Sequence, residues 1–192
     1  RRFEKEGLLT EEDGMIRLFV TSDLRWKCRA TVVATVYDFE GKPLKRFEVS
    51  ASLKPGESKC VRTFRPVDFE GFDPEECFMK LVTTTVCAEE PVPVHENSFF
   101  FAVFKRCAFR PAEVTCEVRE GEPGTFEVAL STDKPVFFVT LDTPGIPGIF
   151  SDNSLTLLPG EPRRLAFRPK EKTSAAALRN SLAVNFLRKT YN

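Results

Sequence analysis

One motif occurs twice in this chain of 192 residues. Residues 53–57 are Leu-Lys-Pro-Gly-Glu and lead to Phe64-Arg65-Pro66, while residues 157–161 are Leu-Leu-Pro-Gly-Glu and lead to Phe167-Arg168-Pro169. Pro-Gly is typical of a tight turn, because proline presets φ at the first corner and glycine accepts the positive φ of the second. Each turn joins two runs of alternating apolar residues, which predicts a duplicated hairpin and two copies of one β-sandwich.

The length of the chain favours two small domains over one. An immunoglobulin-like sandwich takes roughly 100 residues, and the chain has 192. Residues 105–111 interrupt the strand pattern with basic side chains and a proline, which is typical of a hinge. We therefore predict an all-β chain of two tandem immunoglobulin-like β-sandwich domains, residues 1–108 and residues 109–192.

Apolar alternation and β-branched residues indicate the strands. In the first domain the expected strands are residues 16–20, 28–37, 45–53, 59–64, 78–87 and 98–104. In the second domain they are residues 113–118, 125–131, 136–141, 155–158 and 163–167, with a last strand through Leu182, Val184 and Phe186. Residues 173–178, which include three alanines, predict one helical turn before that last strand.

The composition excludes several classes of partner. Hydrophobic residues make up 42% of the chain and charged residues 29%, which is enough apolar material for packed cores. The 28 basic and 28 acidic residues are interspersed, so no basic field predicts binding to nucleic acid. No apolar run approaches the roughly 20 residues of a membrane helix, so we expect no membrane partner.

The sequence begins with neither an initiator Met nor a recognisable signal peptide. Residues 1–4 are Arg-Arg-Phe-Glu, with no hydrophobic core and no small-residue cleavage site. We therefore expect the chain to begin inside a longer gene product, and its localisation stays unassigned.

The six cysteines predict buried free thiols. None forms a C-x-x-C pair, and unpaired cysteine behaves as a small hydrophobic residue. The even count also allows disulfides. The residues are Cys28, Cys60, Cys77, Cys87, Cys107 and Cys116.

Catalytic side chains are not indicated. A glycosidase needs two carboxylates on opposite sides of a sugar, whereas the acidic pairs at residues 75–76 and 89–90 are neighbours in sequence and predict solvated loops. The single histidine, His95, has no accompanying G-x-S-x-G motif, so we expect a solvated or structural histidine. Cys87 ends a strand without any orienting pattern. We therefore predict no catalytic residue in this chain.

Metal and cofactor sites are not indicated either. The best candidate is an acidic loop, but it lacks the ligand order of an EF-hand and contains Pro74. We interpret it as a solvated connection and predict no metal ligand, no cofactor-binding residue and no cofactor. The acids of this loop are Asp68, Glu70, Asp73, Glu75 and Glu76.

The aromatic residues favour packing over sugar binding. Sugar-binding surfaces use the faces of Trp and Tyr, whose polar tips stay in water, but this chain has 19 Phe against two Tyr and one Trp. We expect the Phe side chains to fill cores and a domain interface. Trp26 is the exception, and the two alternatives for it are a sugar contact and packing against a neighbouring domain.

One segment of the second domain points to a family. Residues 146–161, Ile-Pro-Gly-Ile-Phe-Ser-Asp-Asn-Ser-Leu-Thr-Leu-Leu-Pro-Gly-Glu, resemble the C-terminal end of β-mannosidases of glycoside hydrolase family 2, with Phe150-Ser151-Asp152-Asn153 as the specific part. Residues 136–142 and 181–185 add to the resemblance, and the end at residues 191–192 resembles the family's natural C-terminus. Residues 18–24, 37–41 and 95–101 resemble the immunoglobulin-like domain that precedes the last one.

The resemblance implies an accessory role. In this family two sandwich domains precede a (β/α) barrel, and two more follow it; the barrel carries both catalytic glutamates. None of the barrel is found in these residues, so no catalytic residue of the family can be assigned here. The resemblance implies a non-catalytic C-terminal portion of an enzyme that removes terminal β-linked mannose. Its partners would be the catalytic barrel and other domains of the same parent chain, and β-mannosides would bind through the parent enzyme.

Two other functions are compatible with parts of the sequence. One is a carbohydrate-binding or targeting module of a related family 2 β-glycosidase, such as an exo-β-glucosaminidase. The other is a pair of adhesion-like sandwiches from an unrelated surface protein, which leaves residues 150–153 unexplained. For Asp152 and Asn153 we expect hydrogen bonds within their own loop, as is common for Asp and Asn in turns.

Overall fold

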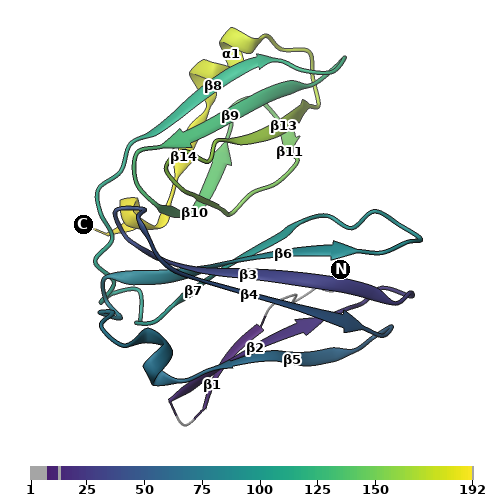
Figure 1. Ribbon diagram of the computed structural model, residues 1–192. Helices are drawn as coiled ribbons and strands as arrows, with labels where there is room; N and C mark the ends of the chain where they lie inside the picture. Colours follow the sequence, from purple (N-terminus) through teal and green to yellow (C-terminus); the bar gives the residue numbers. More distant parts are fainter. Residues whose placement is uncertain (1–7, 13, 192) are drawn as a thin grey trace. The chain divides into compact units, whose positions relative to one another are not determined.

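The structure, a computed structural model, describes residues 8–12 and 14–191 (Figure 1). They form two compact units, each with its own hydrophobic core. Unit 1 comprises the described residues up to Asp38 together with Lys42–Ala108, and unit 2 comprises Phe39–Gly41 and the described residues from Phe109 onward. The predicted all-β class with two tandem immunoglobulin-like sandwiches is confirmed. The domain boundary at residue 108 stays a prediction, and unit 1 ends beside it.

Unit 1 is a sandwich of two antiparallel sheets, drawn as two layers in Figure 1. The first sheet has the order β1-β2-β5 and consists of β1 (Leu8–Glu12), β2 (Met15–Thr21) and β5 (Ser58–Phe64). The second has the order β4-β3-β6-β7 and consists of β4 (Pro43–Leu53), β3 (Cys28–Asp38), β6 (Cys77–Val86) and β7 (His95–Phe100). A short 3-10 helix, η1 (Pro66–Phe69), follows β5.

The core of unit 1 follows from the period of its strands. Successive side chains of a strand point to opposite faces, so every second residue of β3 turns inward. These residues, Ala30, Val32, Ala34 and Val36, are all buried. Leu18 of β2 packs into the same core from the other sheet.

Unit 2 also consists of two antiparallel sheets. The first has the order β11-β13-β9-β8 and consists of β11 (Gly148–Phe150), β13 (Arg163–Pro169), β9 (Phe126–Thr132) and β8 (Val114–Glu120). The second has the order β12-β10-β14 and consists of β12 (Leu155–Leu157), β10 (Val136–Asp142) and β14 (Ala183–Asn185). The helix α1 (Ala175–Ser181) precedes β14, and a 3-10 helix, η2 (Leu187–Thr190), follows it.

The two Pro-Gly turns are present, but they do not form hairpins. Gly56 and Gly160 have positive φ angles of 67° and 76°, as predicted. Each turn is closed by the N–H of the glutamate that follows, which donates to a carbonyl three residues earlier, 3.1 Å in both units. However, β4 and β5 belong to different sheets, and so do β12 and β13. The predicted hairpins are therefore wrong, and each turn instead carries the chain from one sheet to the other.

The reason for this error is that both arrangements need the same sequence pattern. A strand of a hairpin and a strand of an arch between sheets each bury one face, so alternation cannot tell them apart. Leu53 at the end of β4 and Phe64 at the end of β5 are both buried in the core of unit 1, one from each sheet. The arch allows both side chains to face that core.

Other differences from the prediction are local. Strand β7 ends at Phe100 instead of residue 104, because Phe100 pairs with Phe78 and the partner strand β6 begins at Cys77. A turn follows, in which the N–H of Arg106 donates to the carbonyl of Val103 (2.8 Å). Strands β1 and β11 were not predicted, since neither has a long apolar alternation. The predicted helical turn is confirmed as α1, which begins after Ser174, whose hydroxyl accepts from the N–H of Ala177 (3.2 Å). Among the described residues, no helix is long and apolar enough to cross a membrane.

Candidate functional site

The segment Phe150–Asn153 connects the two sheets of unit 2 through side-chain hydrogen bonds. Oδ1 of Asp152 accepts from the N–H of Asn153 (2.8 Å), and Oδ1 of Asn153 accepts from the N–H of Ser154 (3.1 Å). The predicted bonding within the loop is thus confirmed. Oδ1 of Asn153 also accepts from the N–H of Leu141 in β10 (3.1 Å), a longer-range contact that sequence analysis did not find.

Ser151 ties the same segment to the opposite sheet. Its N–H donates to the carbonyl of Ala166 in β13 (2.8 Å), and its Oγ accepts from the N–H of Ala166 (3.0 Å). The ring of Phe150 packs on the ring of Phe167, with centroids 4.7 Å apart. The segment therefore holds β10 and β13 together, and its polar side chains serve the fold of unit 2.

The acidic loop after η1 uses its carboxylates as turn caps and ion-pair partners. Oδ2 of Asp68 accepts from the N–H of Arg65 (2.8 Å), and Oδ1 of Asp73 accepts from the N–H of Glu75 (2.9 Å). Glu75 forms an ion pair with Arg106. In the part of the chain that the structure describes, no group of three or more His, Cys, Asp or Glu residues could hold a metal ion.

The second acidic pair and the histidine lie at one end of unit 1. The Cys87 thiol donates to the Glu89 carboxylate (3.2 Å), while Glu90 faces a hollow of about 200 Å³. We call this space the end hollow. Its lining includes Asp23, Leu24, Glu90, Pro91, Pro93 and His95. Sequence analysis treated residues 89–90 and His95 separately and did not single out Asp23.

The cysteines are unpaired, and three of them are buried as predicted. Cys28, Cys77 and Cys107 are buried, Cys87 and Cys116 are partly buried, and Cys60 is exposed, so the prediction of burial is wrong for Cys60. Cys60 lies on β5, beside a register shift between Leu18 and Phe19 on the paired strand. Burial raises the pKa of the Cys77 thiol to about 11, and it also raises the pKa of Cys107. Buried, protonated thiols are poor nucleophiles.

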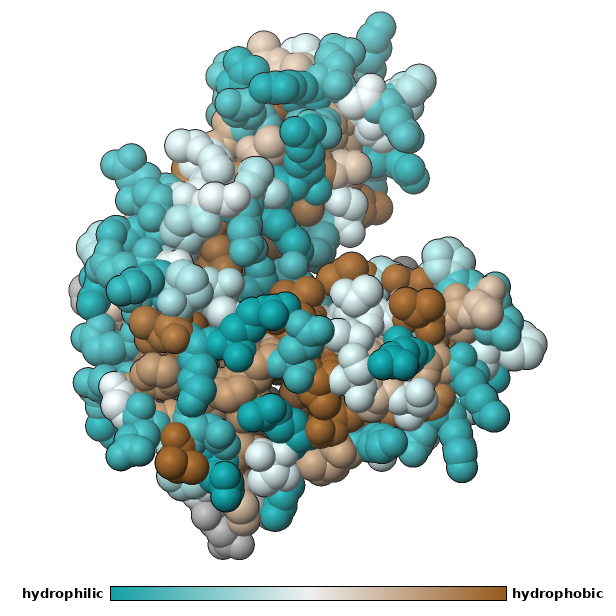
Figure 2. All heavy atoms as spheres, in the orientation of Figure 1, coloured by the Kyte–Doolittle hydropathy of each residue, from teal (hydrophilic) through white to brown (hydrophobic). Residues whose placement is uncertain are grey.

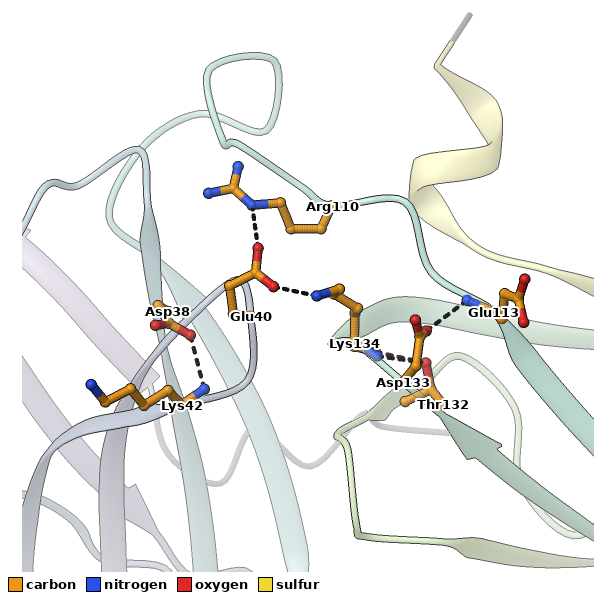
Figure 3. Close-up of polar contacts among 8 residues, drawn as sticks. All are labelled: Asp38, Glu40, Lys42, Arg110, Glu113, Thr132, Asp133 and Lys134. Carbon is orange, nitrogen blue, oxygen red and sulfur yellow. Dashed lines mark hydrogen bonds and ion pairs between the residues drawn. The ribbon is translucent and has the colours of Figure 1, made fainter.

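A carboxylate between two cations is the main ion-pair cluster of unit 2 (Figure 3). Oε1 of Glu40 accepts from Nε of Arg110 (2.9 Å), and Oε2 accepts from Nζ of Lys134. These hydrogen bonds, the one from Lys134 first, lower the pKa of Glu40, and the same bond raises the pKa of Lys134. A carboxylate neutralised in this way has a structural role, because it links Arg110 and Lys134. Sequence analysis missed it, because Glu40 and Lys134 are 94 positions apart.

Large exposed apolar side chains occur mainly in unit 1. On the face drawn in Figure 2, most of the strongly hydrophobic surface, coloured brown, lies in the lower part, which is unit 1. Trp26 is 49% exposed, which leaves both predicted alternatives for it open. The large apolar residues that are exposed in unit 1 are Trp26, Leu44, Val67, Val86, Val94, Val103 and Phe104, and those in unit 2 are Phe138 and Ile149.

Two domain families match the chain in tandem. Residues 14–106 match the Mannosidase Ig/CBM-like domain, and residues 109–190 match the Ig-fold domain named Ig_mannosidase. The chain belongs to the C-terminal immunoglobulin-like domains of family 2 β-mannosidases. The resemblance noted for residues 146–161 is thereby confirmed, and these residues lie within the Ig_mannosidase domain.

Solved structures share the fold of these mannosidase domains. A β-D-mannosidase from Dictyoglomus thermophilum superposes with a TM-score of 0.76 at 18% identity, over 94% of this chain and 21% of its own. An exo-chitosanase, CsxA, from Amycolatopsis orientalis superposes with a TM-score of 0.55 at 14% identity, over 95% of this chain and 25% of its own. The mannosidase domains thus span about a fifth to a quarter of those chains. Among curated protein sequences, none matches the chain.

Proposed function

We propose that this chain is a non-catalytic accessory portion of a β-mannosidase, which packs against the catalytic barrel of the same parent protein and stabilises it. The observation that carries the proposal is the tandem match of two mannosidase domain families, in order, over residues 14–106 and 109–190. The parent enzyme would hydrolyse terminal β-linked mannose, and its catalytic residues would lie outside these two units.

The surface of unit 1 supports a docking role. Val67, Val86 and Val103 are 57%, 67% and 67% exposed. Burying such side chains against another domain would be favourable, at about 25 cal/mol per Å² of apolar area. The acids that sequence analysis considered as candidates support the proposal too. Asp68 and Asp73 cap turns, and Glu75 pairs with Arg106, so these side chains stabilise the fold of unit 1.

A second parent activity is favoured by a specific observation. The exo-chitosanase CsxA shares the fold over 95% of this chain, and one of its solved structures is a complex with PNP-β-D-glucosamine. A parent exo-β-glucosaminidase would use the two units in the same accessory way. In either case the catalytic residues would lie in the barrel, outside these two units.

Enzyme assays test the accessory role. The purified chain is incubated with a chromogenic β-mannoside and, in parallel, with a chromogenic β-glucosaminide. We expect no turnover of either substrate. Hydrolysis that copurifies with the chain through several columns would overturn the proposal.

The gene provides the second test. We expect the coding sequence upstream of Arg1 to encode a barrel with two suitably placed glutamates, whose product hydrolyses the β-mannoside. Deletion of residues 1–192 from that product should lower its thermal inactivation temperature, because the docked surface is lost. An upstream sequence without a barrel contradicts the proposal. Hydrolysis of the glucosaminide alone would favour the second parent activity.

A further inference from the structure

One end of unit 1 brings together two connections that are far apart in the sequence. Residues 22–27 join β2 to β3, and residues 87–94 join β6 to β7. The register explains why they meet: Arg29 near the start of β3 pairs with Val86 at the end of β6, and Thr83 pairs with His95 at the start of β7. The end hollow lies between these two connections and measures about 200 Å³.

The lining of the end hollow has both polar and apolar groups. Asp23 and Glu90 contribute carboxylates, and His95 contributes an imidazole. Leu24, Pro91 and Pro93 contribute apolar surface. Small-molecule sites combine apolar walls with a few polar groups that fix orientation. A pyranose ring fits this combination, because its C–H faces pack on apolar surface while its hydroxyls donate to carboxylates.

Both connections are held by contacts outside the hollow. The N–H of Ser22 donates to the carbonyl of Glu57 (2.9 Å), and the buried Ser22 hydroxyl lies 3.5 Å from Sγ of Cys28. The Cys87 thiol donates to Glu89 at the start of the other connection (3.2 Å). Pro91 and Pro93 restrict φ along it. A site whose walls are already ordered loses less entropy when it binds a ligand.

An indole lies in the same connection as Asp23 and Leu24. Trp26 is the single tryptophan of the chain and is 49% exposed. An indole presents a broad apolar face with a polar N–H at its edge, which suits the face of a sugar ring. Val94, in the other connection, is 56% exposed. Apolar surface therefore continues on both connections that form the hollow.

We propose that the end hollow is a binding site for one sugar unit of a β-linked oligosaccharide. Asp23 and Glu90 accept hydrogen bonds from its hydroxyls, and Trp26 offers a stacking surface for the neighbouring unit. The choice of ligand class rests on the proposed function, whose parent enzyme acts on such sugars. Unit 1 would then hold part of the substrate polymer in addition to docking on the barrel.

Isothermal titration calorimetry on the whole chain tests the site. The probes are β-1,4-linked mannotriose and the β-1,4-linked trimer of glucosamine, titrated separately, with maltotriose as an α-linked control. We expect saturable heat with at least one β-linked trimer and none with maltotriose. Because Trp26 is the only indole, its emission reports on the same binding event. The trimer that binds more tightly identifies the sugar.

Two isosteric variants locate the site. Asp23→Asn and Glu90→Gln keep the shape of the hollow but remove the charges, and each should weaken binding about tenfold, as expected for losing hydrogen bonds to a charged group. Trp26→Ala should weaken binding as well. Glu171→Gln, which changes an exposed carboxylate of unit 2, is the matched control and should bind like the wild type. Unchanged urea midpoints show that the variants are folded.

Two results overturn the inference: no saturable heat with either β-linked trimer, or equal affinity in wild type, Asp23→Asn and Glu90→Gln. Neither result affects the accessory role, which is tested through the barrel encoded upstream and through its thermal inactivation. Conversely, a chain that binds the trimers but lacks an upstream barrel would keep the sugar site and contradict the accessory role.

Discussion

The two units share the order of six strands, but they differ in the sheet that carries the seventh strand, β7 or β11, and in the length of the strands of one sheet. The sheet β1-β2-β5 of unit 1 corresponds to β8-β9-β13 of unit 2, and β4-β3-β6 corresponds to β12-β10-β14. In unit 1, β4 and β3 have 11 residues each and β6 has 10. In unit 2, β12 and β14 have three residues each.

This difference changes what holds each sheet in place. In unit 1 the long ladders of β3 with β4 and β6 supply backbone hydrogen bonds over their whole length. In unit 2 the ladder of β10 with β12 has a register shift between Val136 and Val139, and Asn153 and Ser151 add side-chain bonds to β10 and β13. Backbone pairing accepts many sequences, whereas side-chain bonds require particular residues. The segment 146–161 therefore depends on the identity of its side chains more than the long ladders of unit 1 do.

The largest effect is expected for the phenylalanines of the repeated motif. Phe64 and Phe167 are both fully buried, one in each core. Phe64→Ala and Phe167→Ala should each lower the free energy of unfolding by about 3–5 kcal/mol, because each leaves a cavity. Urea unfolding followed by circular dichroism measures the loss.

Exposed apolar residues provide the matched controls for this pair. Val103 in unit 1 and Ile149 in unit 2 are 67% and 65% exposed. Val103→Ala and Ile149→Ala should each change the free energy of unfolding by less than about 0.5 kcal/mol. If Phe64→Ala costs no more than Val103→Ala, the two motif copies are not equivalent.

The next effect tests the side-chain bonds of unit 2. Asn153→Ala removes the acceptor for the N–H groups of Leu141 and Ser154, and it should lower the free energy of unfolding by about 1–2 kcal/mol. Hydrogen exchange at the Leu141 amide should become faster. Asn153→Asp keeps an acceptor oxygen and should restore most of the loss. Asp152→Ala, which removes only a bond to the next residue, should cost less; an equal cost would contradict the role of Asn153.

A smaller effect compares the two Pro-Gly turns directly. Gly56 and Gly160 have similar positive φ angles, and a Cβ atom at either position meets no described atom within 4 Å. The cost of alanine is therefore conformational alone. Gly56→Ala and Gly160→Ala should each lower the free energy of unfolding by about 1 kcal/mol. Costs that differ by more than the experimental error would show that the turns are strained differently.

The smallest effect depends on pH. The pKa of Glu40 is lowered in the folded protein, so its stabilising contribution is present above the ordinary glutamate pKa and is lost as the pH falls through the folded value. Glu40→Gln should therefore lower the urea midpoint slightly at neutral pH, and the difference from wild type should vanish in acid. High salt should reduce it too. The difference should be absent for Glu171→Gln, and a gap that widens in acid would contradict this assignment.

Sequence patterns predicted the strands well but not their partners. The alternation in β3 and β9 depends on one buried face, which is a local property of the chain. Whether β4 pairs with β5 depends on where both strands end relative to the core, and alternation does not encode it. The contact of Asn153 with Leu141 joins residues 12 positions apart, so the motif predicted only its local bonds.

The end hollow was also beyond sequence reasoning. His95 and Glu90 were considered one at a time, because nothing in the sequence relates them to Asp23. They meet because the register of β3 with β6 and of β6 with β7 aligns their connections. These residues could have been related only by predicting that the neighbouring strands end at the same edge of the sandwich, which would bring their connections together.

Because some thiols are buried and one is exposed, their rates of alkylation measure how often the buried thiols become accessible. Cys60 is exposed, so an alkylating reagent can modify it in the folded state. Cys77 is buried, with its pKa raised to about 11, so its reaction waits for unit 1 to open. Cys28 and Cys107 are buried in the same unit, whereas Cys116 belongs to unit 2. Cys116 is only partly buried, so the rate at which mass spectrometry finds Cys28, Cys77 and Cys107 labelled, relative to Cys60, would record how often unit 1 opens.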